Sequence, residues 1–77
     1  MSMFIAAKSV KKNDVVVIKG QEVTVTRKEA YRRYGRRWVD IEYSYPTVVD
    51  GKQGIWEDEI AVPADVMLPW RGTGLNI

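Results

Sequence analysis

The chain has 77 residues, a net charge of +2 and neither Cys nor His. This length supports one domain, so we treat residues 1–77 as a single unit. Without Cys there are no disulfides or thiolate ligands, and without His the commonest metal ligand and general base are missing. We therefore expect a protein that is not an enzyme, has no catalytic residues, metal ions or cofactors, and depends on packing for its stability.

The charge is distributed unevenly along the chain. Residues 1–38 carry ten basic and three acidic side chains, whereas residues 39–77 carry two basic and seven acidic ones. Such a split is typical of a protein with a charged partner, although the two halves can also interleave in a compact fold and neutralise each other. No run of about 18 apolar residues is present, which excludes a membrane-spanning helix. We expect a cytoplasmic protein.

The first half of the chain predicts short β-strands. Residues 14–18 form a β-branched run between two turn-like segments. Residues 22–26 alternate apolar and polar side chains, as a strand with one buried face does. Residues 38–45 alternate in the same way, and we expect Pro46 to end that strand because proline cannot donate to a sheet.

The segment 27–38 lies between two of these strands and carries six cations, one acid and three aromatic residues. Its Arg, Lys, Glu and Ala residues have good helix propensity, which favours a short helix. Its apolar stripe is thin, however, and both flanks are β-type. We therefore predict two extended arms with Tyr34-Gly35 at the tip and keep the helix as the alternative.

The second half of the chain predicts further strands joined by turns. Asp50-Gly51 is a strong turn signal, and residues 63–66 fit one 3₁₀ turn that begins at a proline. A flexible C-terminal tail is expected at residues 69–77. Strand pieces are expected at residues 48–49, 54–56, 59–62 and 67–68. Together these elements predict an all-β fold: a small, five-stranded, strongly bent barrel with a core of about residues 12–68.

Two segments resemble the SH3-like small β-barrels, the superfamily that includes KOW and Tudor modules. Residues 60–66, Ile-Ala-Val-Pro-Ala-Asp-Val, are similar to the end of such barrels, where a strand runs into a Val-Pro step, a 3₁₀ turn and a final short strand. Residues 12–20, with a polar start, a valine run and a closing Gly, are similar to their first strand. The resemblance covers residues 12–68 and implies a fold used mostly for binding nucleic acid or protein.

Some features depart from the best-known members of that superfamily. Peptide-binding SH3 domains use an acidic loop and two consecutive Trp residues, whereas Trp38 and Trp56 are not adjacent and the long second loop is basic. No aromatic cage of the Tudor type can be assigned to particular residues. The resemblance therefore leaves the ligand open.

The basic segment is the leading functional candidate. Guanidinium groups match phosphate oxygens and stack on bases, and exposed aromatic rings stack on unpaired bases. Because side chains alternate along a strand, only about half of the arginines can share one face. We hypothesise that the chain binds DNA or RNA without catalysis, and that Trp38 has a structural role. The proposed contact residues are Lys28, Tyr31, Arg32, Arg33, Tyr34, Arg36 and Arg37.

Other interpretations of the basic segment remain open. It can be a solvated hairpin whose charges keep a sheet edge from aggregating. It can also bind an acidic protein surface, as in a small adaptor or inhibitor, for example a viral or mobile-element factor that acts on a host protein. A third possibility is a structural subunit of a larger assembly. The sequence leaves the oligomeric state undetermined.

The acidic run Glu57-Asp58-Glu59 and two tryptophans complete the candidates. Carboxylates suit Mg²⁺ and Ca²⁺, but neighbouring acids on a strand point in opposite directions, so we interpret the run as a solvated turn. We expect Trp56 in the core or at the barrel rim. We expect Trp70 to fold back onto the barrel.

Overall fold

The computed structural model describes residues 3–73 as an all-β protein with one 3₁₀ helix. Its six strands form one antiparallel sheet in the order β1-β6-β2-β3-β4-β5. The elements are β1 (Met3–Ala6), η1 (Ala7–Ser9), β2 (Asp14–Ile18), β3 (Gln21–Arg33), β4 (Arg36–Val49), β5 (Lys52–Pro63) and β6 (Met67–Thr73). The all-β prediction is confirmed.

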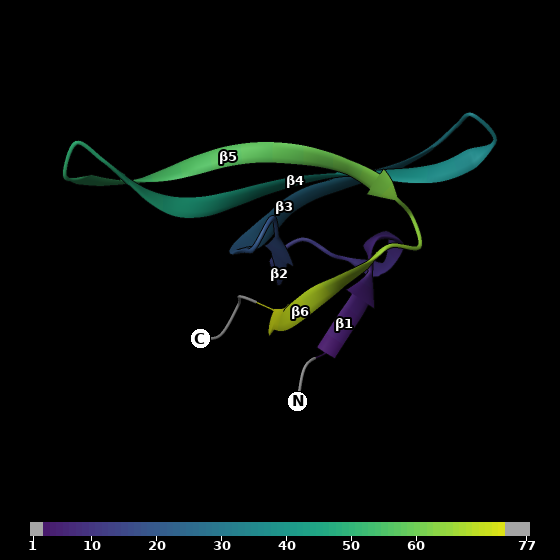
Figure 1. Ribbon diagram of the computed structural model, residues 1–77, viewed down its shortest axis with the longest axis horizontal. Helices are drawn as coiled ribbons and strands as arrows, with labels where there is room; N and C mark the ends of the chain where they lie inside the picture. Colours follow the sequence, from purple (N-terminus) through teal and green to yellow (C-terminus); the bar gives the residue numbers. More distant parts are fainter. Residues whose placement is uncertain (1–2, 74–77) are drawn as a thin grey trace.

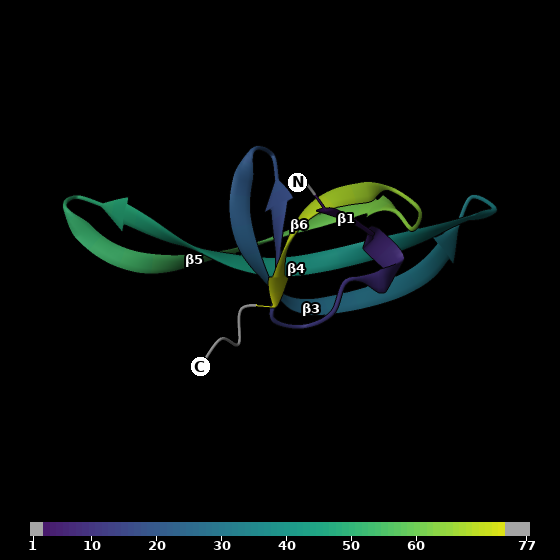
Figure 2. The ribbon, with the colours of Figure 1, turned by 90° about the horizontal axis from the view of Figure 1, so that it is seen from below.

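Two long hairpins give the molecule its elongated shape. Strands β3, β4 and β5 form one long layer, and β1 and β6 lie on one side of it (Figure 1). The β3–β4 and β4–β5 turns extend in opposite directions, which Figure 2 shows from a second side. The radius of gyration is 13.2 Å, against about 11 Å for a compact domain of this size. Both hairpin ends therefore extend beyond the packed body.

The hydrophobic core is small and lies on one face of the curled sheet. Alternation along β2 and β4 directs every second side chain inward, so that Val16, Val39 and Ile41 are fully buried. Partly buried side chains from β1, β5 and β6 pack against this cluster. Its buried members are Ala7, Val10, Val16, Ile18, Val23, Val25, Val39, Ile41, Tyr43 and Ala64.

The prediction of a closed five-stranded barrel is wrong, because the sheet is open and has six strands. The additional strand is β1, which lies before the expected core and pairs with β6. The pairing of β3 with β4 shifts by one residue between Val25 and Arg27, and such a bulge bends a strand and increases its twist. The sheet curls at this point, but within residues 3–73 its outer strands β1 and β5 each pair with one neighbour only.

Two local predictions also differ from the structure, and one agrees with it. The 3₁₀ helix lies at η1 rather than at 63–66, where a single turn is closed by the Val66 amide donating to the Pro63 carbonyl over 3.1 Å. Residues 69–73, expected in the flexible tail, belong to β6, and the remainder of that tail prediction lies outside the described residues. Trp70 packs against the core, in agreement with the interpretation that it folds back.

Strand β4 continues through Pro46, which we expected to end it. The last β4 residue paired with β3 is Ser44, so β4 beyond this point has a neighbour only on the β5 side. Proline is tolerated where its nitrogen faces an unpaired side of a strand. The missing N–H of Pro46 therefore breaks no ladder bond, and the β4–β5 hairpin extends past the body.

Asp14 is the one buried charged residue in the described part of the chain. Its carboxylate accepts hydrogen bonds from the Lys11 amide (2.9 Å) and from the Thr73 hydroxyl (3.2 Å). The Asp14 amide in turn donates to the Lys11 carbonyl over 3.0 Å. These bonds fix the turn before β2 and attach the end of β6 to it. No helix within residues 3–73 has the length and apolar character needed to cross a membrane.

Candidate nucleic-acid interface

The basic hairpin, residues 27–38, is formed by the ends of β3 and β4 around a two-residue turn. The hairpin prediction is confirmed, and the alternative helix is wrong. Tyr34 and Gly35 both have positive φ, 54° and 69°, as a type I′ hairpin turn requires. Tyr34 is unusual here, because bulky residues rarely adopt this conformation. Its side chain is 86% exposed, so no packing explains why an aromatic residue occupies the turn.

The pairing of β3 with β4 divides the four tip arginines between the two faces of the hairpin. Arg33 pairs with Arg36, and Arg32 pairs with Arg37. Residues directly opposite each other on paired strands share a face. One face, which we call the outer face, therefore carries Arg33 and Arg36, as alternation along the strands predicts. The other, the inner face, carries Arg32 and Arg37 and is the face on which Val39 enters the core.

The outer face combines arginines with aromatic rings. The guanidinium of Arg33 lies 5.1 Å from the Tyr34 ring centroid, and that of Arg36 lies 5.9 Å from the Trp38 ring centroid, both within cation–π range. The Trp38 indole N–H donates to the Arg33 carbonyl over 3.1 Å. Trp38 thereby braces the two arms of the hairpin, in agreement with the structural role expected for it.

Tyr31 lies deeper on the outer face, directly opposite Trp38. Its hydroxyl donates to a carboxylate oxygen of Asp40 over 3.2 Å. Partial burial raises the pKa of the Tyr31 phenol, and the charge and hydrogen bond of Asp40 raise it further, against an opposing effect of Arg33. Because its hydroxyl already bonds to Asp40, Tyr31 orients the outer face and is less available to a ligand than Tyr34.

The inner face has a hollow of about 350 Å³ at the base of the hairpin. Its apolar part includes the fully buried Val39, and three cations from different elements line it: Lys8, Arg32 and Arg37. No acidic residue lines this hollow. The complete lining is Lys8, Ala30, Tyr31, Arg32, Arg37, Trp38, Val39 and Ala64.

Backbone bonds bring Lys8 to this hollow. The Ala64 amide donates to the Arg37 carbonyl over 3.0 Å, and the Lys8 amide donates to the Ala64 carbonyl over 2.9 Å. The Lys28 ammonium also donates to the Lys8 carbonyl over 2.6 Å. Sequence reasoning missed Lys8, because only the chain of contacts through Ala64 places η1 beside the hairpin. Lys28, a predicted contact residue, instead attaches β3 to η1.

The tip arginines differ from Arg27 in their partners. Arg27 lies 3.4 Å from Glu42 and 4.0 Å from Glu29, in two exposed ion pairs. Within the described part of the chain, neither these ion pairs nor the remaining one, between Arg71 and Glu22, involves a tip arginine. The charges at the tip are therefore available to an external anion.

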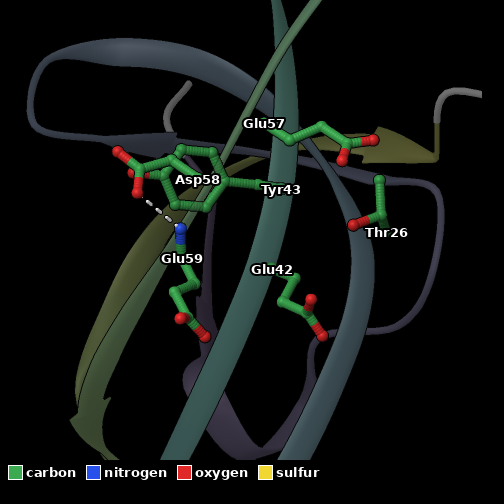
Figure 3. A pocket seen from close by; sticks show the side chains of 6 residues that line it. All are labelled: Thr26, Glu42, Tyr43, Glu57, Asp58 and Glu59. Atoms are coloured by element: carbon green, nitrogen blue, oxygen red, sulfur yellow. Dashed lines mark hydrogen bonds between the residues drawn. The ribbon is translucent and has the colours of Figure 1, made fainter.

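An acidic hollow of about 300 Å³ lies at the β3 bulge, where Thr26, Glu42, Tyr43, Glu57, Asp58 and Glu59 line it (Figure 3). The acidic run 57–59 belongs to β5 and does not form the turn that we expected. Asp58 accepts a hydrogen bond from the Glu59 amide over 2.8 Å. The Glu57 and Glu59 carboxylates point in different directions, and no group of three or more His, Cys, Asp or Glu within residues 3–73 is arranged to hold a metal. Burial raises the pKa of Tyr43, and the charge of Asp58 and the neighbouring Tyr45 raise it further.

The apolar wing, residues 46–56, is the part of the β4–β5 hairpin that extends beyond the body, because Tyr45 still packs against the core. Its side chains include Val48, Ile55 and Trp56, which are 64%, 77% and 54% exposed. We expected Trp56 in the core or at the barrel rim, but it lies outside the core. The sequence signal was ambiguous, because alternation does not distinguish a strand that packs from one that projects.

A comparison with models of protein families gives no match for this chain, and no curated protein matches its sequence. The resemblance to SH3-like modules stays a prediction. The proposals below rest on the geometry of the molecule alone.

Proposed function

We propose that the protein is a non-enzymatic nucleic-acid-binding module whose contact site is the basic hairpin. The observation that carries the proposal is the tip itself: Arg32, Arg33, Arg36 and Arg37 flank a two-residue turn without an acidic partner in residues 3–73. Arginine is the preferred residue for bidentate contacts with phosphate. Solubilising charge alone does not require this concentration of arginine, because lysine is the usual choice on sheet edges.

The inner face fits the phosphate backbone. Lys8, Arg32 and Arg37 surround a hollow that has an apolar floor and no carboxylate. Cations that are grouped around a concave surface reinforce one another, because the low-dielectric wall focuses their field. A phosphate held there would contact groups from three separate elements of the fold.

The outer face and the tip fit an unpaired base. Tyr34 is exposed, lies in a strained conformation and has the Arg33 guanidinium over its ring. Strained backbone tends to be retained where it serves a site, and stacking on an aromatic ring tolerates any base. These properties favour single-stranded DNA or RNA over duplex, although a two-stranded ribbon is also narrow enough for the major groove.

The test measures binding of labelled single-stranded DNA, single-stranded RNA and duplex DNA by fluorescence anisotropy. Arg32→Glu/Arg37→Glu and Arg33→Glu/Arg36→Glu each reverse the charge of one face, and Lys12→Glu/Lys19→Glu makes the same charge change at exposed turns. We expect each arginine variant to lose at least about tenfold in affinity, since one lost contact of this kind costs about 1–3 kcal/mol. If both arginine variants bind as tightly as the lysine control variant, the proposal is refuted.

The same experiment separates the alternative of an acidic protein partner. If no nucleic acid binds to the unmodified protein above the level of an unrelated protein of similar charge, nucleic acid is not the ligand. The free arginines would then be assigned to a protein surface. Circular dichroism of each variant confirms that it is folded.

A further inference from the structure

Strand β5 is one edge of the sheet, and its outer side has no neighbour within residues 3–73. Residues 52–59 are all exposed. Sheet edges present unpaired N–H and C=O groups, which proteins usually protect with bulges, proline or charged side chains. Residues 53–56 of β5 carry no charge, and its charged residues lie on either side of them. The pairing of β5 with β4 is regular throughout, and the single proline of β5 is its last residue, Pro63. The edge along the apolar wing is therefore free to pair with another strand.

The two-residue turn at Asp50-Gly51 determines which groups point outward. The turn residues have φ of 53° and 77°, so Val49 and Lys52 are the hydrogen-bonded pair that closes a type I′ hairpin. Hydrogen-bonded and non-hydrogen-bonded pairs alternate in an antiparallel ladder. Even-numbered residues of β5 thus bond to β4, and odd-numbered residues direct their N–H and C=O outward. The outward Glu59 amide, which donates to the Asp58 side chain, agrees with this assignment.

From this edge we propose that two copies of the chain form a homodimer by antiparallel pairing of β5 with β5, centred on Ile55. This register places the outward-facing backbone groups of Ile55 opposite those of the second copy's Ile55, as a hydrogen-bonded pair requires. It also places Lys52 opposite Asp58 of the second copy, twice by symmetry. Opposite charges at directly paired positions stabilise a sheet.

The side chains along the wing support the same register. Trp56 lies opposite Gly54 of the second copy, and an aromatic residue across from an edge glycine covers its bare backbone. No atom lies within 4 Å of where a Cβ of Gly54 would be, so the space beside it is open. Ile55, which is 77% exposed in the single chain, becomes covered by its symmetry mate.

Neighbouring registers lack this complementarity. A shift of the centre to Gly54 places Lys52 opposite Trp56, and Asp58 then lies beyond the end of β5 in the second copy, at the level of its turn. The lysine thereby loses its carboxylate partner. A shift to Trp56 places Ile55 opposite Glu57 and leaves Lys52 opposite Ile60. Centring on Ile55 alone pairs the lysine with a carboxylate and the isoleucine with its own copy.

Single-cysteine cross-linking tests the register, because the natural chain has no Cys. Hydrogen-bonded antiparallel pairs have Cα atoms about 5.5 Å apart, within disulfide range. We expect Ile55→Cys to form a covalent dimer under mild oxidation. The matched variant Gln53→Cys has its thiol opposite Glu57 of the second copy and stays uncross-linked. Equal cross-linking by both variants, or none by either, would contradict the proposal.

A charge swap tests the pairing without covalent chemistry. Light scattering over a range of protein concentrations measures the dissociation constant of the dimer. Because the substituted positions are exposed, we expect each variant to fold, and circular dichroism confirms this. We expect Lys52→Glu and Asp58→Lys each to shift the dimer towards monomer by at least about tenfold in dissociation constant. The double variant Lys52→Glu/Asp58→Lys restores the dissociation constant of the unmodified protein, and Lys19→Glu does not change it. A monomeric unmodified protein, or a double variant that stays dissociated, would overturn the proposal whatever the result for nucleic acid.

Discussion

The basic hairpin and the apolar wing are two extensions of one strand, because β4 begins beside Tyr34-Gly35 and ends beside Asp50-Gly51. Both turns have two residues of positive φ, and both hairpins leave the body in opposite directions (Figure 1). Their side chains differ: one tip has four arginines without ion-pair partners in residues 3–73, and the other has exposed Val48, Val49 and Ile55.

This comparison shows that the backbone positions the two ends while the side chains decide what each can bind. The packed body between them is the part on which both depend. If the proposed dimer forms at the wing, the basic tips lie at its far ends and two sites act together on one strand of nucleic acid. Linking two sites raises the overall affinity without any new contact.

The largest expected effect on the free energy of unfolding comes from a substitution in the middle of β4. Ile41 is fully buried there, so we expect Ile41→Ala to lower the free energy of unfolding by about 2–5 kcal/mol. Ile55→Ala on the wing should change it by less than about 0.5 kcal/mol in dilute protein, because the side chain is exposed. Urea unfolding measures both. Similar losses for the two variants would show that the wing is part of the packed body.

The next effect concerns the two turns. Gly35 and Gly51 have φ of 69° and 77°, and nothing lies within 4 Å of an added Cβ. We expect Gly35→Ala and Gly51→Ala each to cost about 1–2 kcal/mol from backbone strain alone. Gly54→Ala, where φ is not positive, should be neutral or slightly stabilising. Thermal unfolding of the three variants checks whether the two ends have equivalent turns.

The smallest effect appears only at high pH. Tyr43 is 3% exposed and its pKa is raised, first by burial and then by Asp58 and Tyr45. A raised pKa means that the folded state keeps the phenol proton longer than the unfolded state. Stability is therefore complete below about pH 10 and falls as pH rises through the folded pKa. We expect Tyr43→Phe to reduce this alkaline loss when unfolding by urea is followed over a range of alkaline pH.

Part of the fold was predictable because it depends on local sequence. Alternation at the start of β3 and in the middle of β4 identified inward residues such as Val25 and Ile41, and Tyr34-Gly35 and Asp50-Gly51 marked the turns. Strand β1 was missed because its four residues form a strand only through pairing with β6. The extent of β4 was underestimated because the tolerance of Pro46 depends on where β3 stops pairing.

The candidate site was predictable only in composition. The sequence identified the arginines and their division between two faces, which the pairing of Arg32 with Arg37 and Arg33 with Arg36 confirms. The contribution of Lys8 to the inner-face hollow depends on a backbone bond to Ala64, which lies 56 positions further along the chain. Contacts over such separations leave no local signal.

The salt dependence of single-stranded DNA binding tests the central claim most directly. The logarithm of the association constant is measured against the logarithm of salt concentration for the unmodified protein and for a variant with Arg32, Arg33, Arg36 and Arg37 changed to Gln. Loss of the two inner-face contacts, those of Arg32 and Arg37, makes the slope shallower by about 1.4, since each phosphate contact to a single strand contributes about 0.7. Identical slopes for the two proteins would contradict the assignment of the basic hairpin as the nucleic-acid interface.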